Sequence, residues 1–405
     1  MLRFLTKGHR SRRTLIFASA THFWSDLFFA LLVPLLILMK EDPELNLSFT
    51  EVGLLRGAHS AASAALQVPF GFLAERIGEF LMLLGGNIWV AASFVILAAA
   101  SSFPMLLYVT VIGGLGGGTQ HPLASSLVSR IYDRRGRSTA VGTLNFAGDP
   151  GKMAAPAVAL ILAIPYGWRT TMRVVGMAGV AFMFLSIFAR KSVHGGRPSP
   201  EQSKALVDKV GSVRVAGFID LSVVGFLDSA ARAAALTFLP FLMREKGMGT
   251  EQIFVMLILL LAGGAIGKFV CGWLDERYGS VMLIWATKGL TAALLLVVYL
   301  IPTSVMAPMM VVLGIGLNGT SSVLYATVAK FVPPRLRARF YSFFYTTGEI
   351  AGAVSPFLFG FIADVFDIRT AIVILSLVTI LILPTSLSLK KHLAHQPPAT
   401  SREAP

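Results

Sequence analysis

The sequence predicts an all-α membrane protein in which twelve transmembrane helices form two pseudo-symmetric six-helix bundles. The first reason is composition: 55% of the 405 residues are apolar, only 14% are charged, and the mean hydropathy is +0.72. An average soluble domain carries roughly 25% charged residues. The second reason is that apolar runs of about 20 residues, the length that crosses a bilayer, recur along the chain. The third is that motifs of the first half return in the second.

The first six apolar windows account for the N-terminal half of the chain. Each is long enough to cross the hydrocarbon core, and because a backbone in lipid must satisfy its own hydrogen bonds, each should be a helix. We place them at 14–39, 49–74, 80–100, 105–130, 138–163 and 172–190. Residues 1–190 are therefore predicted to form the N-terminal six-helix bundle.

The longest polar interruption, residues 191–213, follows the sixth window and is predicted to be a cytoplasmic linker. Within it, residues 201–210 fit either a short amphipathic helix at the membrane surface or a plain solvated segment. Six further windows form the predicted C-terminal bundle, 214–391, at 215–242, 251–274, 280–301, 305–329, 340–363 and 368–389. The Pro- and Ala-rich remainder, 392–405, is predicted to be a disordered cytoplasmic tail.

Basic residues are concentrated in short loops on one side of the predicted bundle. The formal net charge is +14, which in a soluble protein would suggest a nucleic-acid partner. Here residues such as Arg134, Arg135 and Arg137 lie between apolar runs, which is typical of loops kept on the inner side of a membrane. We predict a multi-pass protein of the bacterial inner membrane with both termini in the cytoplasm and no nucleic-acid partner. The single Cys271 excludes a disulfide framework.

A loop motif occurs once in each half, as GFLAERIG at 71–78 and as GWLDERYG at 272–279. Such an internal repeat indicates two structurally related halves. The glycines should allow a sharp turn and close helix contact, and the acid and arginine should pair or cap a helix end, holding the two bundles together on the cytoplasmic side. The residues of this predicted gating motif are Gly71, Glu75, Arg76 and Gly78 in the first copy and Gly272, Asp275, Glu276, Arg277 and Gly279 in the second.

With this motif after its second and eighth spans, the chain resembles the major facilitator superfamily over all twelve spans. Three stretches are similar to fosmidomycin-resistance-type exporters of that family: THFWSD at 21–26, QHP at 120–122 and NFAGDPGKMAAP at 145–156. The resemblance implies a secondary transporter whose bundles rock around a central site. Several positions depart from the family pattern, among them Glu79-Phe80, where basic residues are frequent, and Ala155, where glycine is usual. Glu75 stands where aspartate is usual, and Thr110 lies near the place of the membrane-embedded arginine of proton-coupled drug exporters.

Ionisable side chains near the middle of the spans are candidates for the transport site, because each is costly in hydrocarbon unless it is paired or hydrated. His22 and Asp26 are four residues apart, as are Asp228 and Arg232, so each pair shares a helix face. The repeat places the two pairs at equivalent positions facing the pseudo-symmetry axis, where such folds bind substrate. The candidate substrate-binding residues are His22, Asp26, Arg56, His59, His121, Asp228, Arg232, Asn318 and Tyr325.

The candidates for proton coupling are Asp26, Asp149 and Glu349. Asp149 can pair with Lys152 or with another helix. Glu349 has no basic neighbour three or four residues away, and an unpaired buried glutamate tends to be protonated near neutral pH. A protonated glutamate that only hydrogen-bonds across helices is an equal interpretation. Lys268 and Lys288 lie closer to helix ends and are interpreted as snorkelling to the interface.

The expected function is secondary active transport of a small amphiphilic or anionic organic molecule, with export coupled to inward proton movement by alternating access. Proton-coupled uptake of an organic anion uses the same residues and is one alternative. A second is a divalent metal-ion carrier in which His22, Asp26, His59 and His121 converge, although Arg56 beside them would repel a cation. The Asp228–Arg232 pair also fits a purely structural salt bridge.

Other classes lack their signatures in this sequence. We find no phosphate-binding G-x-x-x-x-G-K-[ST] loop and no nucleophile–base pair, so we expect neither an ATP-driven pump nor an enzyme. We expect a monomer without a cofactor or a resident metal. Its expected partners are a small-molecule substrate, protons and the lipid bilayer.

Overall fold

The structure is a computed structural model that describes residues 9–132, 134–193, 214–333 and 337–394, and its regular elements in these ranges are all helical. The first half contains α1 (His9–Lys40), α2 (Phe49–Ile77), α3 (Glu79–Leu97), α4 (Phe103–Gly117), α5 (Gln120–Ile131), α6 (Arg134–Val158), the π-helix η2 (Ala159–Ala163), α7 (Ile164–Ser186) and the 3-10 helix η3 (Ile187–Ser192). The predicted linker lies outside the described residues from 194 onward, and with it the predicted amphipathic segment.

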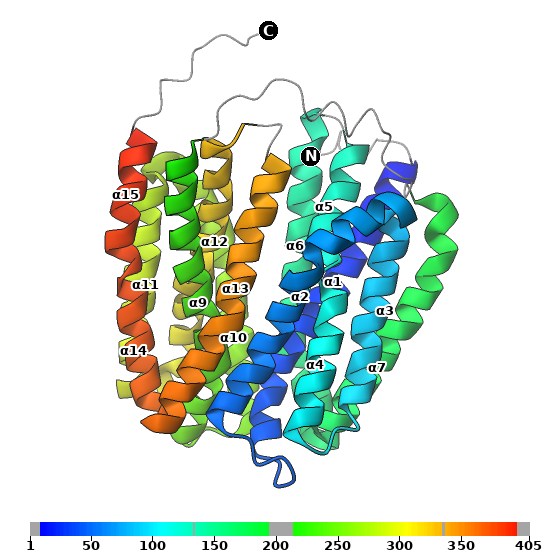
Figure 1. Cartoon of the computed structure of the whole chain (residues 1–405). Coiled ribbons are helices and arrows are strands. Elements are labelled where there is room, and N and C mark those ends of the chain that lie inside the picture. Colours follow the sequence, from blue (N-terminus) through cyan, green and yellow to red (C-terminus); the bar gives the residue numbers. More distant parts are fainter. Residues whose placement is uncertain (1–8, 133, 194–213, 334–336, 395–405) are drawn as a thin grey trace.

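The second half repeats this plan. It contains α9 (Val215–Glu245), α10 (Thr250–Tyr278), α11 (Ser280–Leu300), the short η4 (Thr303–Val305), α12 (Met306–Phe331), α13 (Arg337–Val365), α14 (Ile368–Ile380) and α15 (Ile382–Ala394). The first three residues of the predicted tail thus continue α15, and the rest of it lies outside the described residues. Figure 1 shows the two groups of helices standing side by side.

Several predicted spans are interrupted rather than straight. The predicted span 105–130 is two helices, α4 and α5, which meet at a turn formed by Gly118 and Thr119. The fifth and sixth spans run on without a loop, and Gly167, with a φ of 78°, separates them. Within the described residues, nine helical segments are long and apolar enough to cross a membrane. One of these, 140–192, holds two spans, and α2 and the broken α4–α5 pair complete the twelve.

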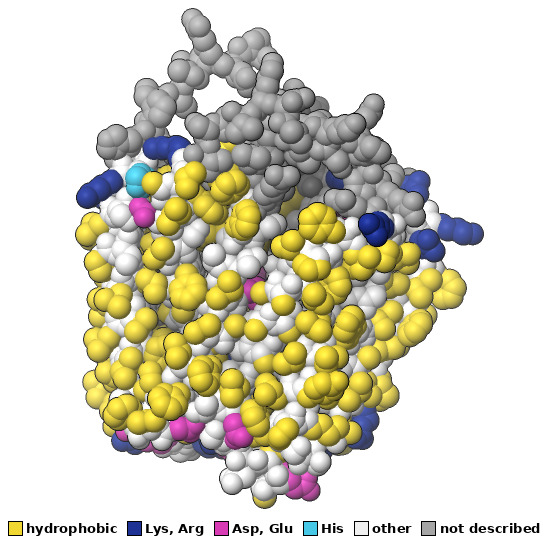
Figure 2. All heavy atoms as spheres, in the orientation of Figure 1, with side chains coloured by type: hydrophobic (Ala, Val, Ile, Leu, Met, Phe, Trp, Pro, Cys, Tyr) yellow, Lys and Arg dark blue, Asp and Glu magenta, His cyan; other side chains and the backbone are white. Residues whose placement is uncertain are grey.

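The outer surface of the helices is apolar in a broad band, and the charged side chains visible in Figure 2 gather toward its two ends. Large side chains such as Phe188 and Phe269 are more than 80% exposed on this band. A soluble protein of this size rarely exposes such contiguous apolar area. The band is therefore the lipid-facing surface of a multi-pass membrane protein.

The two halves meet along α2 and α13, which lie against each other at one end of the molecule and diverge toward the other (Figure 1). We call the end where α1 begins and α15 ends the terminal face, and the opposite end the far face. Near the far face, a Cβ on Gly53 or Gly57 of α2 would collide with the backbone carbonyls of Pro356 and Ala353 of α13. Glycine at these two positions therefore permits the close approach of the halves.

Polar contacts also join the halves at the far face. Arg244 at the end of α9 donates two hydrogen bonds to Glu41, of 2.6 and 3.0 Å. Asp364 of α13 accepts from the backbone amides of Phe49 and Thr50, at 2.8 and 2.7 Å, and so caps the first turn of α2 from the other half. An anion at a helix N-terminus satisfies free amides and the helix dipole. The far face is therefore closed in this structure.

The repeated loop motif forms equivalent turns, but its described contacts lie within each half. Gly78 and Gly279 adopt φ values of 95° and 80°, which only glycine adopts without strain. Gly71 has no neighbouring atom within 4 Å of a Cβ placed on it, and Gly272 makes only ordinary contact, so the predicted close helix contact at these two glycines is wrong. Arg76 and Arg277 are exposed, and the side chains of Glu75 and Glu276 lie outside the described part of the chain.

Each half closes this turn with its own ion pair. In the first half, buried Glu79 at the start of α3 pairs with Arg130 and accepts a hydrogen bond from Ser126, both on α5. In the second half, Asp275 at the end of α10 lies 3.4 Å from Lys330 and accepts a hydrogen bond of 2.7 Å from Ser280. The acidic residue therefore lies at the start of the helix after the turn in the first half and at the end of the helix before the turn in the second. The basic residue lies at the equivalent position in both halves.

Candidate functional site

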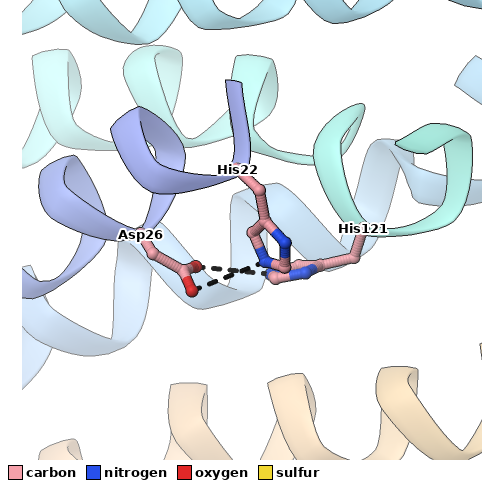
Figure 3. Close-up of side chains that lie close together, drawn as sticks. All are labelled: His22, Asp26 and His121. Carbon is pink, nitrogen blue, oxygen red and sulfur yellow. Dashed lines mark ion pairs between the residues drawn. The ribbon is translucent and has the colours of Figure 1, made fainter. Parts of the chain in front are cut away.

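Asp26 lies at the centre of a buried polar cluster in the first half. Its carboxylate is within 3.5 Å of His22 Nε2, 3.9 Å of His121 Nε2 and 3.0 Å of Lys152 Nζ. Figure 3 shows His22 and Asp26 on one helix and His121 reaching the carboxylate from another. Asp26 is only 2% exposed, and because a carboxylate buried in hydrocarbon needs compensation, Lys152 is the cation that keeps it ionised.

The protonation geometry of His22 follows from its neighbours. Its Nδ1 lies 2.8 Å from the Leu144 carbonyl, which can only accept a hydrogen bond, so Nδ1 carries the hydrogen. In the neutral ring, Nε2 then presents a lone pair to Asp26 and makes no hydrogen bond among the described residues. Uptake of one proton at Nε2 would turn this unfavourable contact into an ion pair. His22 and Asp26 therefore form a site for one proton.

Glycine makes this cluster compact. A Cβ on Gly148 of α6 would collide with the carboxylate of Asp26 and crowd the ring of His22. The absence of a side chain there lets α6 pack directly against α1 and brings Lys152, one turn further along, to Asp26. α6 continues as a helix through Pro150.

The equivalent cluster in the second half is arranged around Asp228. Lys288 Nζ of α11 lies 2.6 Å from Asp228 Oδ1, and neither side chain is more than 1% exposed. The same lysine donates to the Leu317 carbonyl at 3.2 Å. Arg232 approaches the other carboxylate oxygen at 3.7 Å and donates to Ser229 at 3.1 Å. Lys288 is therefore the main partner of Asp228, and the interpretation of Lys288 as a snorkelling residue is wrong.

Arg56 and Glu349 face each other across the contact between α2 and α13. The Arg56 guanidinium lies 4.0 Å from the centre of the Phe29 ring and donates to Ser60 at 3.3 Å. Ser60 also hydrogen-bonds Glu349, and the charges of Arg56 and Glu349 act on each other. Among the described residues, no basic nitrogen lies within ion-pair distance of the Glu349 carboxylate, and the charges that act on it, those of Arg56 and His121, come from the other half of the molecule.

A second ionic contact between the halves involves Asp149. Its carboxylate pairs with Lys268 of α10 and lies 4.0 Å from Lys152 of its own helix. Lys268 therefore points to the centre of the molecule and does not snorkel to the interface. Asn318 of α12 completes the lining of a cavity of about 30 Å³ beside these three side chains.

Aromatic rings form one wall of the centre. The rings of His121 and Tyr345 are stacked with centroids 6.0 Å apart, and Tyr345 packs on Tyr325 at 4.8 Å. Tyr325 is also within the electrostatic influence of Arg232, Glu349, Asp228 and Asp26. Aromatic rings beside charged side chains give this part of the centre both an apolar face and a charge.

The structure gathers most, but not all, of the predicted substrate-binding residues. His22, Asp26 and His121 lie together, with ligand atoms within 4.8 Å of one another. Asp228 and Arg232 form the matching pair of the second half. His59 instead packs against Phe29, with ring centroids 5.5 Å apart, and is not part of the His22 group. The metal-carrier hypothesis, which needed all four ligands to converge, thus loses one of them.

Sequence reasoning missed the lysines. Lys152, Lys268 and Lys288 supply the nearest cations to Asp26, Asp149 and Asp228, yet none was proposed as a site residue. The signal was available: each lysine lies within a predicted span, where an ionisable residue is a candidate by default, although the positions of Lys268 and Lys288 nearer the span ends favoured snorkelling. Ser60 and Tyr345 could not have been singled out, because serine and tyrosine are ordinary residues of such helices.

The chain matches the family model described as Major Facilitator Superfamily over residues 15–304 and 221–404. A gentisate transporter of Corynebacterium glutamicum is 27% identical over 345 residues, which cover 78% of this chain and 74% of that protein. The fosmidomycin resistance protein of Escherichia coli is 22% identical over 367 residues, 89% of this chain and 88% of that protein. The resemblance to that type of exporter is therefore found over most of the chain.

Among solved structures, the fold is similar to a bacterial homolog of the human lysosomal transporter Spinster, in an inward-facing and occupied conformation. The TM-score is 0.83 at 18% sequence identity, and the match covers 97% of this chain and 100% of that one. At this identity the similarity concerns the fold: twelve helices in two related bundles.

Proposed function

The chain belongs to the major facilitator superfamily, and from that premise we propose that it exports a small organic anion by alternating access, coupled to inward proton movement. Membership makes it a multi-pass membrane transporter of small organic solutes and not an enzyme. The substrate class, the coupling ion and the direction are the parts that we propose. We further propose that the protein lies in the bacterial inner membrane as a monomer.

The observation that best supports an anionic substrate is the position of Arg232. Because Lys288 already neutralises Asp228 at 2.6 Å, Arg232 at 3.7 Å remains the less engaged cation of the pair. Near the middle of the described spans, cations outnumber carboxylates. The cations are Arg56, Lys152, Arg232, Lys268 and Lys288, and the carboxylates are Asp26, Asp149, Asp228 and Glu349. An excess of buried positive charge is relieved by an anion.

The aromatic wall narrows the proposed substrate to an aromatic carboxylate or a molecule of similar shape. A ring that stacks on Tyr325 or Tyr345 would place its charged group toward Arg232. A guanidinium binds a carboxylate through two parallel hydrogen bonds, which fixes the orientation of the ligand. The gentisate transporter among the relatives supports this class, because gentisate is an aromatic carboxylate.

Proton coupling is proposed for the His22–Asp26 pair, with Asp149 and Glu349 as further carriers. The lone pair of neutral His22 faces Asp26, and one proton would satisfy both groups. Glu349 lies at the contact between α2 and α13, so its protonation would weaken its attraction to Arg56 across the halves.

The proposed direction rests on orientation and on the relatives. We propose that the terminal face, and both termini, lie in the cytoplasm, because the positive-inside rule keeps arginine-rich loops on that side. The far face, closed by Arg244–Glu41 and Asp364, then faces outward, and the site would load from the cytoplasm. A resistance protein among the relatives supports export. Uptake by proton symport would use the same residues, but the anion would then move in the same direction as the proton instead of the opposite one.

Transport of a divalent metal ion is the weaker candidate. His22, Asp26 and His121 offer suitable ligand atoms. However, Lys152 Nζ lies 3.0 Å from Asp26, and its positive charge would repel a dication. The metal-carrier alternative therefore requires removal of a buried positive charge before binding.

The test is flux in proteoliposomes loaded with labelled gentisate, to which a pH step is applied in either direction. We expect gentisate to leave the more alkaline side against its own gradient when the opposite side is acidified. Protein-free liposomes, which pass only the neutral acid, give the baseline. Protein-dependent gentisate flux that is indifferent to both pH steps contradicts proton coupling, and no flux of gentisate or benzoate contradicts the substrate class.

A further inference from the structure

Asp149 connects two lysines from different halves of the molecule. Its carboxylate pairs with Lys268 of α10 and lies 4.0 Å from Lys152 of α6, while Lys152 also lies 3.0 Å from Asp26. No other carboxylate of the described residues lies within ion-pair distance of Lys268. Lys152 therefore has two carboxylate partners, whereas Lys268 depends on Asp149 alone.

The space around this contact is too small for an organic anion as it stands. The cavity lined by Asp149, Lys152, Lys268 and Asn318 measures about 30 Å³. A cavity needs roughly 10–15 Å³ to hold one water molecule, so this one has room for solvent but not for a benzoate-sized ligand. A ligand that reached these lysines would have to displace the carboxylate that is already there.

The lysines need an anion whether or not Asp149 supplies it. Lys152, Lys268 and Arg232 act on one another as like charges in the interior of the protein. Without Asp149, Lys268 would have no carboxylate within ion-pair distance among the described residues, and Lys152 would keep only Asp26, so the two ammonium groups would repel each other with no anion between them. The position between Lys152 and Lys268 is therefore an anion position, and Asp149 fills it in this structure.

We infer that Asp149 acts as an internal substitute for the substrate: the carboxylate of the transported anion takes its place between Lys152 and Lys268. This inference rests on the proposed transport of an organic anion and adds Lys152 and Lys268 to Arg232 as the cations that bind its carboxylate. It also explains how loading could free the bundles, because a substrate that takes over Lys268 removes an ionic link between α6 and α10. When the substrate leaves, Asp149 returns and the link re-forms.

The inference predicts that variants of Asp149 and Lys268 change the affinity for the substrate in opposite directions, which a purely structural salt bridge does not predict. If Asp149 competes with the substrate, Asp149→Asn should lower the Kd for gentisate by about tenfold, because the competent fraction of the site rises. Lys268→Gln should raise the Kd by about tenfold or more, because it removes a cation that holds the ligand. A structural bridge predicts changes of the same sign in both variants, since either one breaks the same contact.

The experiment is calorimetric titration of the purified full-length protein with gentisate, with Glu44→Gln as the control. Glu44 is an exposed acid that contacts Arg169, so its variant should bind as the wild type does. A Kd that rises or stays unchanged in Asp149→Asn, while the wild type binds gentisate, overturns the inference and leaves the proposed function standing. A wild type that does not bind gentisate or benzoate counts against the proposed function itself.

A second measurement needs no ligand. Spin labels on cysteines at Phe146 of α6 and Phe269 of α10, both strongly exposed, report the spacing of the two helices in a Cys271→Ser background. We expect the Asp149→Asn variant to populate longer distances than the parent, because the ionic link between the helices is gone. An unchanged distance distribution shows that the link does not hold the halves and overturns the inference, whatever gentisate does.

Discussion

Lys288 and Asp228 form an ion pair that is closed to solvent: the Nζ–Oδ1 distance is 2.6 Å, and the two side chains are 0% and 1% exposed. Arg232, one helical turn from Asp228, stays 3.7 Å from the other oxygen. A buried carboxylate that has found a close partner has less to gain from a second one. The consequence is that Arg232 keeps a positive charge directed at the centre of the molecule, where the proposed substrate binds.

The first prediction concerns this pair. Lys288→Met should destabilise the fold by about 3–5 kcal/mol, because it leaves the Asp228 carboxylate buried without its main cation. It should also weaken gentisate binding, because Arg232 would move to Asp228. Thermal unfolding in detergent and titration calorimetry measure the two effects. The double variant Lys288→Met with Asp228→Asn should recover most of both, and a double variant as weak in binding as the single one would refute this explanation.

The second prediction tests whether Arg232 binds the substrate. Arg232→Lys keeps the charge but loses the planar pair of donors, so gentisate affinity should fall by about tenfold or more while the unfolding temperature barely changes. Arg369→Lys is the matched control, because Arg369 pairs with Glu245 at the far face and not at the centre. Equal gentisate affinity in the two variants would show that Asp228–Arg232 is a purely structural salt bridge, which the four-residue spacing also allows.

The third prediction assigns the coupling proton. Asp26→Asn keeps the shape of the side chain but cannot form the charged pair with His22, so it should abolish gradient-driven accumulation of gentisate and still allow downhill exchange. Proteoliposome counterflow and pH-driven flux separate these two activities. If the variant still concentrates gentisate against a gradient, the proton is carried elsewhere, and Glu349 is the first candidate.

The helical fold was predictable because a backbone in lipid must satisfy its own hydrogen bonds. Hydropathy and length placed twelve spans, and the repeated motif with Gly78 and Gly279 located equivalent turns. Hydropathy averaged over a whole window did not show that the fourth span breaks at Gly118 and Thr119. The windows also left a gap between residues 163 and 172, whereas the structure has a 53-residue helical segment that runs on through Gly167.

Most residues of the site were predictable from the sequence, but their ion-pair partners were not. Spacing of four residues identified His22 with Asp26 and Asp228 with Arg232, since a helix places such residues on one face. Which cation neutralises which acid depends on how helices cross. Lys152 reaches Asp26 because Gly148 lets α6 approach α1, and Lys268 reaches Asp149 from the other half. No single sequence carries that distance information.

The fourth prediction concerns the closed far face. Glu41→Gln removes the two charged contacts to Arg244, a partly exposed pair worth about 0–1 kcal/mol. The fold should remain stable, but the population open at the far face should rise by up to about fivefold. The alkylation rate of a cysteine at buried Phe241, which lines the space beside this pair, reports that opening. Glu44→Gln, whose partner Arg169 belongs to the same half, should leave the rate unchanged.

A rise in alkylation rate in the Glu44→Gln control as large as that in Glu41→Gln would show that loss of any acid at this face loosens it. The link between the halves would then not depend on Arg244 and Glu41. The capping of α2 by Asp364 would become the next contact to test.

The central claim is that the substrate is an anion recognised by its charge. The most direct measurement compares gentisate with its uncharged amide, 2,5-dihydroxybenzamide, as competitors of labelled gentisate flux in proteoliposomes. The account predicts that unlabelled gentisate competes and that the amide, with the same ring and hydroxyl groups, competes at least about tenfold more weakly, since it offers no negative charge to Arg232 and the lysines. Equal competition by the amide would contradict the account.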